Sequence, residues 1–455
     1  MSVELLARLQ FAFTVAFHYI FPPLSIGLGV LLVIMEGMYL KTKNKMYEQM
    51  TKFWVKVFAL TFAMGVATGI VMEFEFGTNW ATYSRYVGDV FGSALAAEGI
   101  FAFFLESGFL AVLVFGWNKV GPKMHFFSTC MVSLGSMMSA VWIVVANSWM
   151  QTPAGFHIVG EGMNARAEIT DFWAMVFNPS SVVRLSHVMS GAWLAGATLV
   201  LSVSAYYLLK QRHLDIAKSA MKISIVLLAF ASLFQLFTGH QSAVVVSKYQ
   251  PAKMAAFEAH YDSSAVAPFY LFGWVNEEQE EVQFGIAVPK MLSFLIHGDF
   301  NTPVTGLRAF KKEDRPPVNI VFQFYHLMVA IGMALIVLSV VLVFLWWRGK
   351  LFTYPLVLKI SVASVLLPQI ANQVGWFAAE VGRQPWIVYG LLRTSEAFSK
   401  NVSEGQLWFS LILFFIIYSL LFALFIFLLD QKIKHGPDDT TEIPSEYEHQ
   451  KQLFV

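Results

Sequence analysis

The sequence predicts an all-α protein, a polytopic membrane bundle of nine transmembrane helices with its N-terminus outside and its C-terminus in the cytoplasm. Composition and the spacing of apolar runs predict this class. Hydrophobic residues make up 57% of the 455 residues and charged residues only 13%. Many apolar residues fall into runs of the length, about 20 residues, that crosses a bilayer as a helix. A soluble core does not require such runs, so we assign the chain to the membrane proteins.

Nine stretches are long enough to span a bilayer, with ends defined to within a few residues. They comprise residues 11–40, 51–76, 91–117, 124–150, 182–209, 216–238, 318–347, 353–381 and 405–431. Pro22 and Pro23 should kink the first stretch. This stretch is too long for a cleavable signal and lacks a small-residue cleavage site, so we expect it to remain as a helix. The sequence shows no internal repeat.

Basic residues in the short connections predict the orientation, because Lys and Arg are retained on the cytoplasmic side. Most of them follow spans one, three, five, seven and nine, for example Lys41, Lys119 and Lys210. The chain therefore divides into four parts. These are the first six spans (1–238), an external loop (239–317) with a mixed-charge run from Lys248 to Tyr261, the last three spans (318–431), and a polar, acidic cytoplasmic tail (432–455).

The charge balance and the cysteine content exclude several classes of protein. A net charge of +1 argues against a nucleic-acid partner, because binding phosphates needs a basic excess. The single cysteine, Cys130, excludes an internal disulfide, a paired-cysteine haem attachment site and an iron–sulfur cluster.

Two glutamates, Glu98 and Glu106, lie eight residues apart in the third span. An ionised carboxylate in hydrocarbon costs roughly 3 kcal/mol or more, so a chain that keeps two of them on one helix has a use for them. A rise of about 1.5 Å per residue separates them by roughly 12 Å on the same broad side of the helix. This geometry suits a water-bridged proton relay. The alternative is a pair of neutral acids hydrogen-bonded within a helix bundle.

Of the histidines, only His18, His187 and His326 lie well within predicted spans. A cytochrome b that holds two haems by paired histidines needs two such residues on each of two helices, and that pattern is missing from the sequence. Any haem would therefore need mixed ligands. His187 and Met328 lie near the outer starts of spans five and seven, and a His/Met pair favours electron transfer. The alternative for each residue is ordinary core packing.

The end of span eight, Gly375 to Trp386, carries the most specific local pattern. Glu380 and Arg383 share a helical face, and proline with tryptophan ends the helix at the interface. Arg383 offers a fork of donors suited to a carboxylate such as a haem propionate, while Glu380 could bind iron or receive protons. The alternative is an interfacial salt bridge with a tryptophan anchor.

Together, four features resemble subunit I of the cytochrome bd quinol oxidases. They are Arg8-Leu9-Gln10-Phe11 with His18, the run Met72-Glu73-Phe74-Glu75-Phe76-Gly77-Thr78-Asn79-Trp80, the Glu98/Glu106 helix, and Gly382-Arg383-Gln384-Pro385-Trp386. The resemblance covers essentially the whole chain. It implies a terminal oxidase of the bacterial cytoplasmic (inner) membrane that oxidises quinol and reduces dioxygen to water. It also implies two haem b groups, one low-spin and one high-spin, and one haem d (chlorin).

The resemblance also assigns roles to residues. His187 and Met328 resemble the axial pair of the low-spin haem, whereas His18 and Glu380 resemble the ligands of the two high-spin haems, without deciding which haem binds to which ligand. Further roles follow for Glu98 and Trp376 near the oxygen-reducing site and for Arg383, Gln384 and Trp386 in propionate binding or structure. A second large membrane subunit is implied as a partner, with a small accessory subunit as a further candidate.

Lys253 and Glu258 lie in a stretch of the external loop that is similar to the family's quinol-binding segment. A lysine and a carboxylate could hold and deprotonate a quinol hydroxyl. We expect both to lie away from the haem ligands, and the alternative is a solvated helix face. Two features depart from the family pattern: the loop lacks a long insertion, and His326 stands where other members have arginine.

The candidate ligands all lie toward the outer ends of their spans. Quinol oxidised there would release protons outside, while oxygen reduction would draw them from the cytoplasm, which separates charge without pumping. Glu106, with Ser139 expected at comparable depth on span four, resembles the inward-facing proton route that leads to Glu98. The competing class is a cofactor-free, proton-coupled secondary transporter that uses the same two glutamates. A structural membrane anchor is a third class, but it would not need this set of ligands.

Overall fold

The computed structural model describes residues 2–438. Within them the main helices are α1 (Val3–His18), α2 (Phe21–Thr42), α3 (Lys45–Thr78), α4 (Ala81–Tyr86), α5 (Gly88–Glu98), α6 (Phe104–Phe115), α7 (Pro122–Gln151), α8 (Phe172–Val176), α9 (Ser181–Leu209), α10 (Leu214–Tyr249), α11 (Pro251–Phe257), α12 (Met291–His297), α13 (Val318–Trp347), α14 (Pro355–Ala363), α15 (Leu366–Val381), α16 (Thr394–Ala397) and α17 (Glu404–His435). A π-helical segment, η1 (Gly99–Phe103), joins α5 to α6, and short 3₁₀ turns occupy Gly162–Asn164, Leu307–Ala309 and Lys312–Asp314.

Three small antiparallel hairpins complete the described chain. They are β1 (Phe156–Val159) with β2 (Arg166–Ile169), β3 (Phe269–Asn276) with β4 (Glu281–Val288), and β5 (Trp386–Val388) with β6 (Leu392–Arg393). The β3–β4 pair runs from Phe269 opposite Val288 to Asn276 opposite Glu281, with two irregularities in register. All three hairpins lie in connections and leave the membrane-crossing part entirely helical.

Nine segments among residues 2–438 are long and apolar enough to cross a membrane, which confirms the predicted class and number of spans. The first segment is Val3–Thr42 and is divided into α1 and α2. The break falls at Tyr19 and Ile20, directly before the prolines, which occupy the first turn of α2, where a missing backbone N–H costs nothing. The eighth segment is also divided, between α14 and α15.

The sixth span differs from its predicted extent. Residues 216–238 were expected to cross, but α10 continues to Tyr249. The first residues of the predicted external loop, 239–249, are therefore helical. The mixed-charge run from Lys248 to Tyr261 is not one amphipathic segment but the end of α10 followed by the short helix α11, which starts at Pro251.

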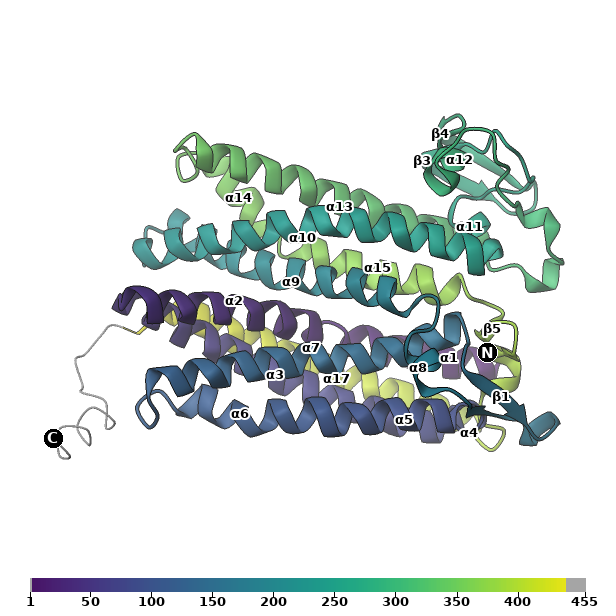
Figure 1. The fold of residues 1–455 in the computed structure, drawn as a ribbon, viewed down its shortest axis with the longest axis horizontal. Helices are drawn as coiled ribbons and strands as arrows, with labels where there is room; N and C mark the ends of the chain where they lie inside the picture. Colours follow the sequence, from purple (N-terminus) through teal and green to yellow (C-terminus); the bar gives the residue numbers. More distant parts are fainter. Residues whose placement is uncertain (1, 439–455) are drawn as a thin grey trace.

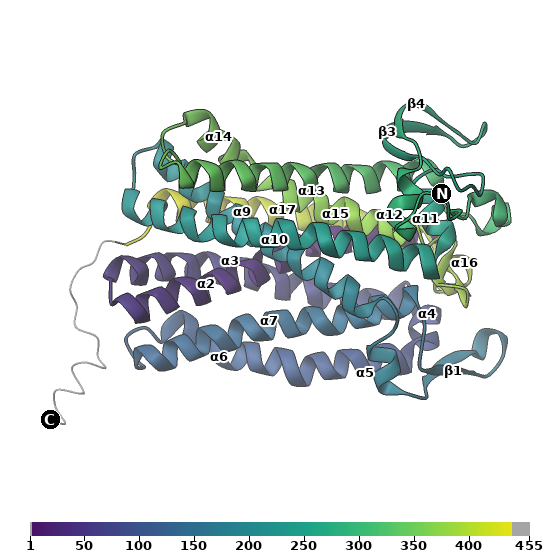
Figure 2. The same ribbon diagram turned by 45° about the horizontal axis from the view of Figure 1, so that its top comes forward.

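The two ends of the bundle differ in what covers them (Figure 1). The N-terminus lies at the same end as α11, α12 and the hairpin β3–β4, and the chain leaves α17 at the opposite end. Figure 2 shows the hairpin and α16 capping that first end from another side. Of the expected tail, 432–455, only residues up to 438 are described, and they continue from α17.

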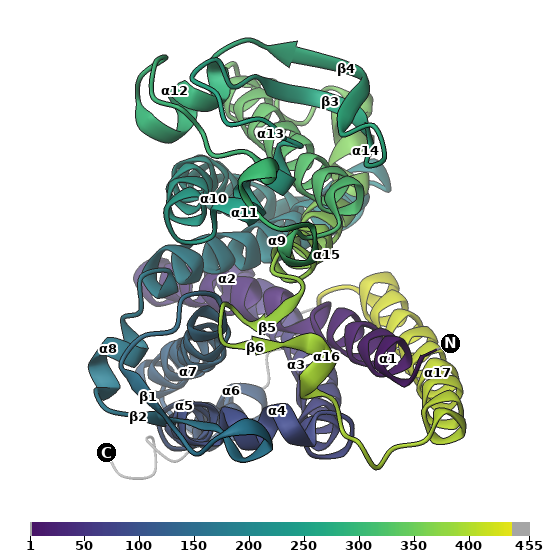
Figure 3. The same cartoon turned by 90° about the vertical axis from the view of Figure 1, so that its right-hand side faces the viewer.

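Four helices form a ring that organises one half of the bundle (Figure 3). α9 packs on α10, α10 on α13, α13 on α15, and α15 again on α9. α2 joins this ring to the other half through α9, where glycines let two backbones touch. A Cβ on Gly27 would lie 2.4 Å from the backbone oxygen of Ala192 and 2.7 Å from Gly196, so only glycine permits this approach.

Candidate functional site

His187 and Met328 lie on diagonally opposite helices of the ring, α9 and α13. The Sδ atom of Met328 lies directly against Gly375 of α15, where a Cβ would come within 2.7 Å. Both nitrogens of His187 have partners on α10: Nδ1 is 3.2 Å from Thr238 Oγ1 and Nε2 is 3.0 Å from Gln235 Nε2. The ring of helices thus brings the two predicted axial residues into one four-helix enclosure.

His18 ends α1, at the break before α2. Its Nδ1 atom is 2.9 Å from the Oγ1 atom of Thr68 on α3. The neighbouring residue Tyr19 contacts Trp376 edge-on, with ring centroids 5.6 Å apart, and Gln373 donates to the backbone of Ala16 at 2.7 Å. α15, which carries Glu380, therefore crosses the end of α1 and brings the helices of the two predicted high-spin ligands together.

The Glu380 carboxylate lies in a dense polar network. Its Oε1 atom accepts from Asn147 Nδ2 and Gln151 Nε2, both at 3.1 Å, and its Oε2 atom is 2.5 Å from Arg383 Nη2. Arg184 approaches the carboxylate at 4.0 Å and donates to Asn147 at 2.5 Å. Three helices, α7, α9 and α15, and the residues directly after α15 supply these groups.

Positive charge exceeds negative charge in this network, because the two guanidinium groups of Arg184 and Arg383 face the single carboxylate of Glu380. Lys253 lies on the same network. The Lys253 ammonium donates to Gln151 at 2.5 Å and to Gln250 at 2.8 Å. Burial lowers the pKa of Lys253 well below its ordinary value, and the positive charge of Arg184 lowers it further. We name Arg184, Arg383, Lys253 and Glu380 the cation cluster.

The cation cluster also holds donors that are buried without a partner among residues 2–438. These are Arg383 Nη1 and Arg184 Nε. An unpaired buried donor costs about 1–3 kcal/mol, so a site with surplus positive charge and two such donors is suited to an added anion. Haem propionates are carboxylates, and the cluster lies between the helices that carry His18, His187 and Glu380. The residues present therefore fit a haem.

Two further residues of the Gly-Arg-Gln-Pro-Trp run shape the chain where it leaves α15. The side chain of Gln384 accepts from Thr394 Oγ1 at 2.8 Å. The indole of Trp386 lies under the guanidinium of Arg393, 4.6 Å from the ring centre, and its backbone oxygen accepts from Arg383. These contacts hold Arg383 in place, so Gln384 and Trp386 support the cluster through the backbone.

Glu98 and Glu106 both face α7, and each is held by one serine hydroxyl. Ser139 donates to Glu98 at 2.5 Å, and Ser136 donates to Glu106. The expectation that Ser139 lies level with Glu106 is therefore wrong. α6 and α7 are antiparallel neighbours, so the residue later in α7 meets the residue earlier in the third span, and the π-helical segment between the acids alters their helical phase.

Lys253 and Glu258, predicted to hold a quinol hydroxyl together, point in different directions. Both are buried, at 1% exposure each, so the alternative of a solvated helix face is wrong. Lys253 also does not lie away from the candidate ligands, because it donates to Gln151, which donates to Glu380. Lys253 points into the cation cluster, whereas Glu258 faces α13, 4.0 Å from His326. Burial raises the pKa of Glu258 to about 8, and the nearby Tyr325 hydroxyl offsets part of the rise.

Several polar partners in the bundle are not evident from the sequence. Asn147 and Gln151 lie one helical turn apart in an apolar span, a spacing that places both on one face and was a usable signal. Glu75 is 2% exposed, and neither of its carboxylate oxygens has a hydrogen-bond partner among the described residues. Glu36 and His125, 2.6 Å apart, form a buried pair. Glu36 is the single acid of its predicted span, whereas Glu75 lies two residues after Glu73 in the second span, a spacing that could have marked it.

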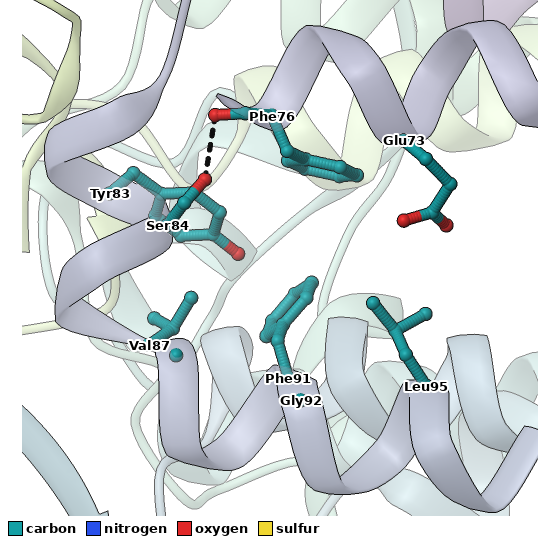
Figure 4. Close-up of a pocket in the computed structure, with 9 residues that line it drawn as sticks. Glu73, Phe76, Tyr83, Ser84, Val87, Phe91, Gly92 and Leu95 are labelled. Atoms are coloured by element: carbon teal, nitrogen blue, oxygen red, sulfur yellow. Dashed lines mark hydrogen bonds between the residues drawn. The ribbon is translucent and has the colours of Figure 1, made fainter. Parts of the chain in front are cut away.

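A cavity of about 200 Å³ lies between the end of α3 and α5 (Figure 4). Phe76, Phe91 and Leu95 supply apolar walls, and the Glu73 carboxylate and the Tyr83 hydroxyl lie at its edge. Its size is below the roughly 300–1,000 Å³ of typical ligand pockets. Leu95 is less than one turn from Glu98, so the cavity borders the acid helix.

The candidate ligands are single side chains on separate helices. Within residues 2–438 no three His, Cys, Asp or Glu side chains come together as a site for a bare metal ion. Haem iron needs only one or two ligands from the protein, because the macrocycle fills its other positions.

Comparison with known proteins identifies the family. The family model described as "Cytochrome bd terminal oxidase subunit I" matches residues 6–437. This chain belongs to that family. It is 40% identical over 448 residues to "Cytochrome bd ubiquinol oxidase subunit 1" of Bacillus subtilis (strain 168), covering 96% of this chain and 95% of the relative. It is 35% identical over 498 residues to "Cytochrome bd-II ubiquinol oxidase subunit 1" of Escherichia coli (strain K12), covering 95% and 96%.

A solved structure agrees with the sequence relatives. The bd oxidase from Geobacillus thermodenitrificans superposes with a TM-score of 0.88 at 28% identity, covering 96% of this chain and 99% of that one. The cytochrome bd subunit is thus an oxidoreductase of the terminal-oxidase class, a haem protein and a multi-pass protein of the bacterial inner membrane. The comparisons confirm the resemblance seen in the sequence and give no support to a cofactor-free transporter.

Proposed function

We propose that this subunit binds three haems, oxidises membrane quinol at the outer face and reduces dioxygen to water with protons from the cytoplasm, building a proton-motive force without pumping. One observation carries the proposal. The ring of α9, α10, α13 and α15 encloses His187 and Met328 directly beside the cation cluster, whose unpaired donors suit haem propionates.

The haem complement in this proposal is two haem b and one haem d. His187 and Met328 bind the low-spin haem b, and His18 and Glu380 bind the high-spin pair. When bound, the haems supply the one-electron carriers and the site of oxygen reduction. Arg383, with Arg184 and Lys253, binds propionates. Trp376 packs between Tyr19 and Arg184, and so fixes the end of the His18 helix against α15.

Quinol binds beside α11 in this proposal, where Glu258 follows the last residue of the helix and Lys253 lies on its other side. Glu258 is buried beside Tyr325 and His326, and its pKa of about 8 suits a base that accepts a proton from a quinol hydroxyl near neutral pH. Lys253 lies toward the cation cluster, so α11 would join the quinol site to the residues that would hold a haem propionate. This adjacency favours rapid electron transfer from quinol into the bundle.

Protons for water formation enter through α6 and α7. Glu106 receives them at its Ser136 contact and passes them to Glu98, which is held by Ser139 near the oxygen-reducing site. A neutral hydroxyl partner leaves each carboxyl able to gain and lose a proton, whereas a cationic partner would hold it ionised.

The N-terminal end of the bundle, with α11 and the β3–β4 hairpin, faces outward, as the basic residues of the short connections support. A second large membrane subunit packs against exposed apolar helices, and a small accessory subunit is a further candidate. α17 carries many exposed large apolar side chains, for example Phe409, Phe415 and Leu420. Affinity purification of this chain from native membranes tests the partner, and recovery of this chain alone contradicts it.

The dithionite-reduced optical spectrum tests the haem assignment. His187→Ala and Met328→Leu should each remove the low-spin b signal and leave the high-spin signals, because the two residues come from opposite helices of one ring. Thr198→Val, which alters a buried α9 hydroxyl bonded to its own helix, serves as the control. An unchanged low-spin signal in both variants would refute the pairing.

A further inference from the structure

Each of the two histidines proposed as haem ligands lies against a Thr–Gly pair on a neighbouring helix. His18 Nδ1 is 2.9 Å from Thr68 Oγ1, and a Cβ on Gly69 would come within 3.3 Å of the His18 ring edge at Cε1. His187 repeats this arrangement with the pair Thr238–Gly239, at 3.2 Å and 3.5 Å. The sequence shows no repeat, yet the two halves of the bundle build the same contact.

We propose that Thr68–Gly69 and Thr238–Gly239 are two equivalent seats that fix the tautomer and position of His18 and His187 for iron. The threonine sets which ring nitrogen carries the proton, and the glycine leaves room for the ring edge. This inference rests on the proposed haem ligation and names positioning residues for it.

The direction of the Thr–His hydrogen bond follows from the hydroxyl's own donation. Thr68 Oγ1 donates to the backbone oxygen of Met64 at 2.8 Å, and Thr238 Oγ1 donates to that of Gln235 at 3.3 Å. A hydroxyl has one hydrogen, so toward the histidine it can only accept. Where the hydroxyl donates to its own helix, Nδ1 of the ring is the donor and carries the proton; the 2.8 Å bond of Thr68 supports this more strongly than the 3.3 Å bond of Thr238.

A histidine protonated at Nδ1 presents the lone pair of Nε2, which is the form that binds a metal. An independent contact at His187 agrees. The amide nitrogen of Gln235 lies 3.0 Å from His187 Nε2, and an amide nitrogen can only donate a hydrogen bond. Nε2 thus already acts as an acceptor, and iron would take the place of the Gln235 amide.

The glycines complete the seats by steric means. At Gly69 a Cβ would sit at 3.3 Å, tighter than ordinary contact, so Gly69→Ala should displace the His18 ring. At Gly239 the distance would be 3.5 Å, within ordinary van der Waals contact, so Gly239→Ala should be milder. The two seats therefore differ in tightness, with the His18 seat the stricter one.

The test is a crossed pair of substitutions in the complete oxidase, read by haem content, reduced spectrum and midpoint potential. Thr238→Val should alter only the low-spin signal and weaken retention of that haem roughly 10–100-fold, the usual cost of losing an outer-shell partner. Thr68→Val should do the same only for a high-spin signal. Thr68→Ser and Thr238→Ser keep the hydroxyl and should restore the wild-type signals.

Matched controls are Thr61→Val on α3 and Thr198→Val on α9, whose hydroxyls donate only to their own helices. Unchanged spectra and potentials in both seat variants, or changes at both haems from either one, would overturn the seats. If His187→Ala removes the low-spin signal and Thr238→Val leaves it intact, the seat proposal fails alone. If His187→Ala leaves that signal intact, the haem assignment itself fails.

Discussion

Two groups of acids in this bundle, one in the third span and one at the end of α15, differ in what holds them. Glu98 and Glu106, in the third span, each accept a hydrogen bond from one neutral serine of α7. Glu380, at the end of α15, accepts from two amides and pairs with Arg383, with Arg184 close by. Serine partners leave a carboxyl free to change protonation, whereas cationic partners favour one charged state.

This contrast assigns different roles to the two groups of acids by the chemistry of their partners rather than by their position in the sequence. The serine-held acids suit proton transfer, and the cation cluster suits fixed charge that positions anionic groups. Substitutions in the first group should therefore change turnover and leave haem binding intact. Substitutions in the second should change haem binding first.

The largest expected effect comes from Glu380→Gln. The change leaves the guanidinium groups of Arg184 and Arg383 without their carboxylate, so two like charges repel. The cost should be below the about 3–5 kcal/mol of a fully buried pair, because the Glu380 side chain is 32% exposed while that of Arg383 is only 4% exposed. We expect a lower unfolding temperature and loss of a high-spin haem, measured by thermal unfolding and haem quantification.

The matched control for that substitution is Glu4→Gln, which breaks an exposed pair with Arg8 (3.7 Å) and should cost less than about 1 kcal/mol. Normal haem content and stability in Glu380→Gln would mean that the cation cluster needs no anion from the chain, and the contrast between the two acid groups would fail.

An effect of intermediate size is expected at Glu258, as a dependence of the quinol oxidation rate on pH. Its carboxylate is the base, so quinol oxidation should rise with pH, about tenfold per unit below the pKa of about 8, and level off above it. Glu258→Gln should lower kcat/KM for a soluble quinol about 100-fold and flatten this profile, with haem content unchanged. Lys253→Met, at the cation cluster, should disturb a haem spectrum as well. A flat wild-type profile between pH 6 and 9 would remove Glu258 from proton transfer.

The smallest effects should come from the serines. Ser136→Ala and Ser139→Ala each remove one hydrogen bond of about 1 kcal/mol from a carboxyl, so oxygen uptake should fall only a few-fold. Ser128→Ala is the control, because that hydroxyl donates only to its own helix. Abolished turnover in either variant would indicate that the hydroxyl itself carries the proton.

The sequence predicted the class, the number of spans and most helix bounds because apolar length and basic connections report directly on the bilayer. The split of the first span also followed from Pro22 and Pro23. The extension of α10 to Tyr249 did not, because its last turns leave the apolar stretch and are stabilised by packing rather than composition.

Side-chain pairing was less predictable than the fold. Ser136 rather than Ser139 contacts Glu106, because a π-helical segment shifts the helical phase between the two acids. No local sequence pattern predicts that segment. Lys253 reaches the cation cluster only because α11 folds back onto the bundle. The Thr–Gly seats at His18 and His187 join residues about fifty positions apart, which composition and spacing do not reveal.

The central claim, that serine-held acids carry protons while the cation cluster holds haem, is tested most directly by Glu106→Gln. This change keeps the shape and hydrogen bonding of the side chain but removes its titratable proton. Oxygen uptake and the reduced spectrum should be measured on the same preparation. The account predicts uptake lowered about 100-fold with all haem signals retained and still reducible by quinol. Wild-type turnover in Glu106→Gln would contradict it and leave Glu106 as a packing residue.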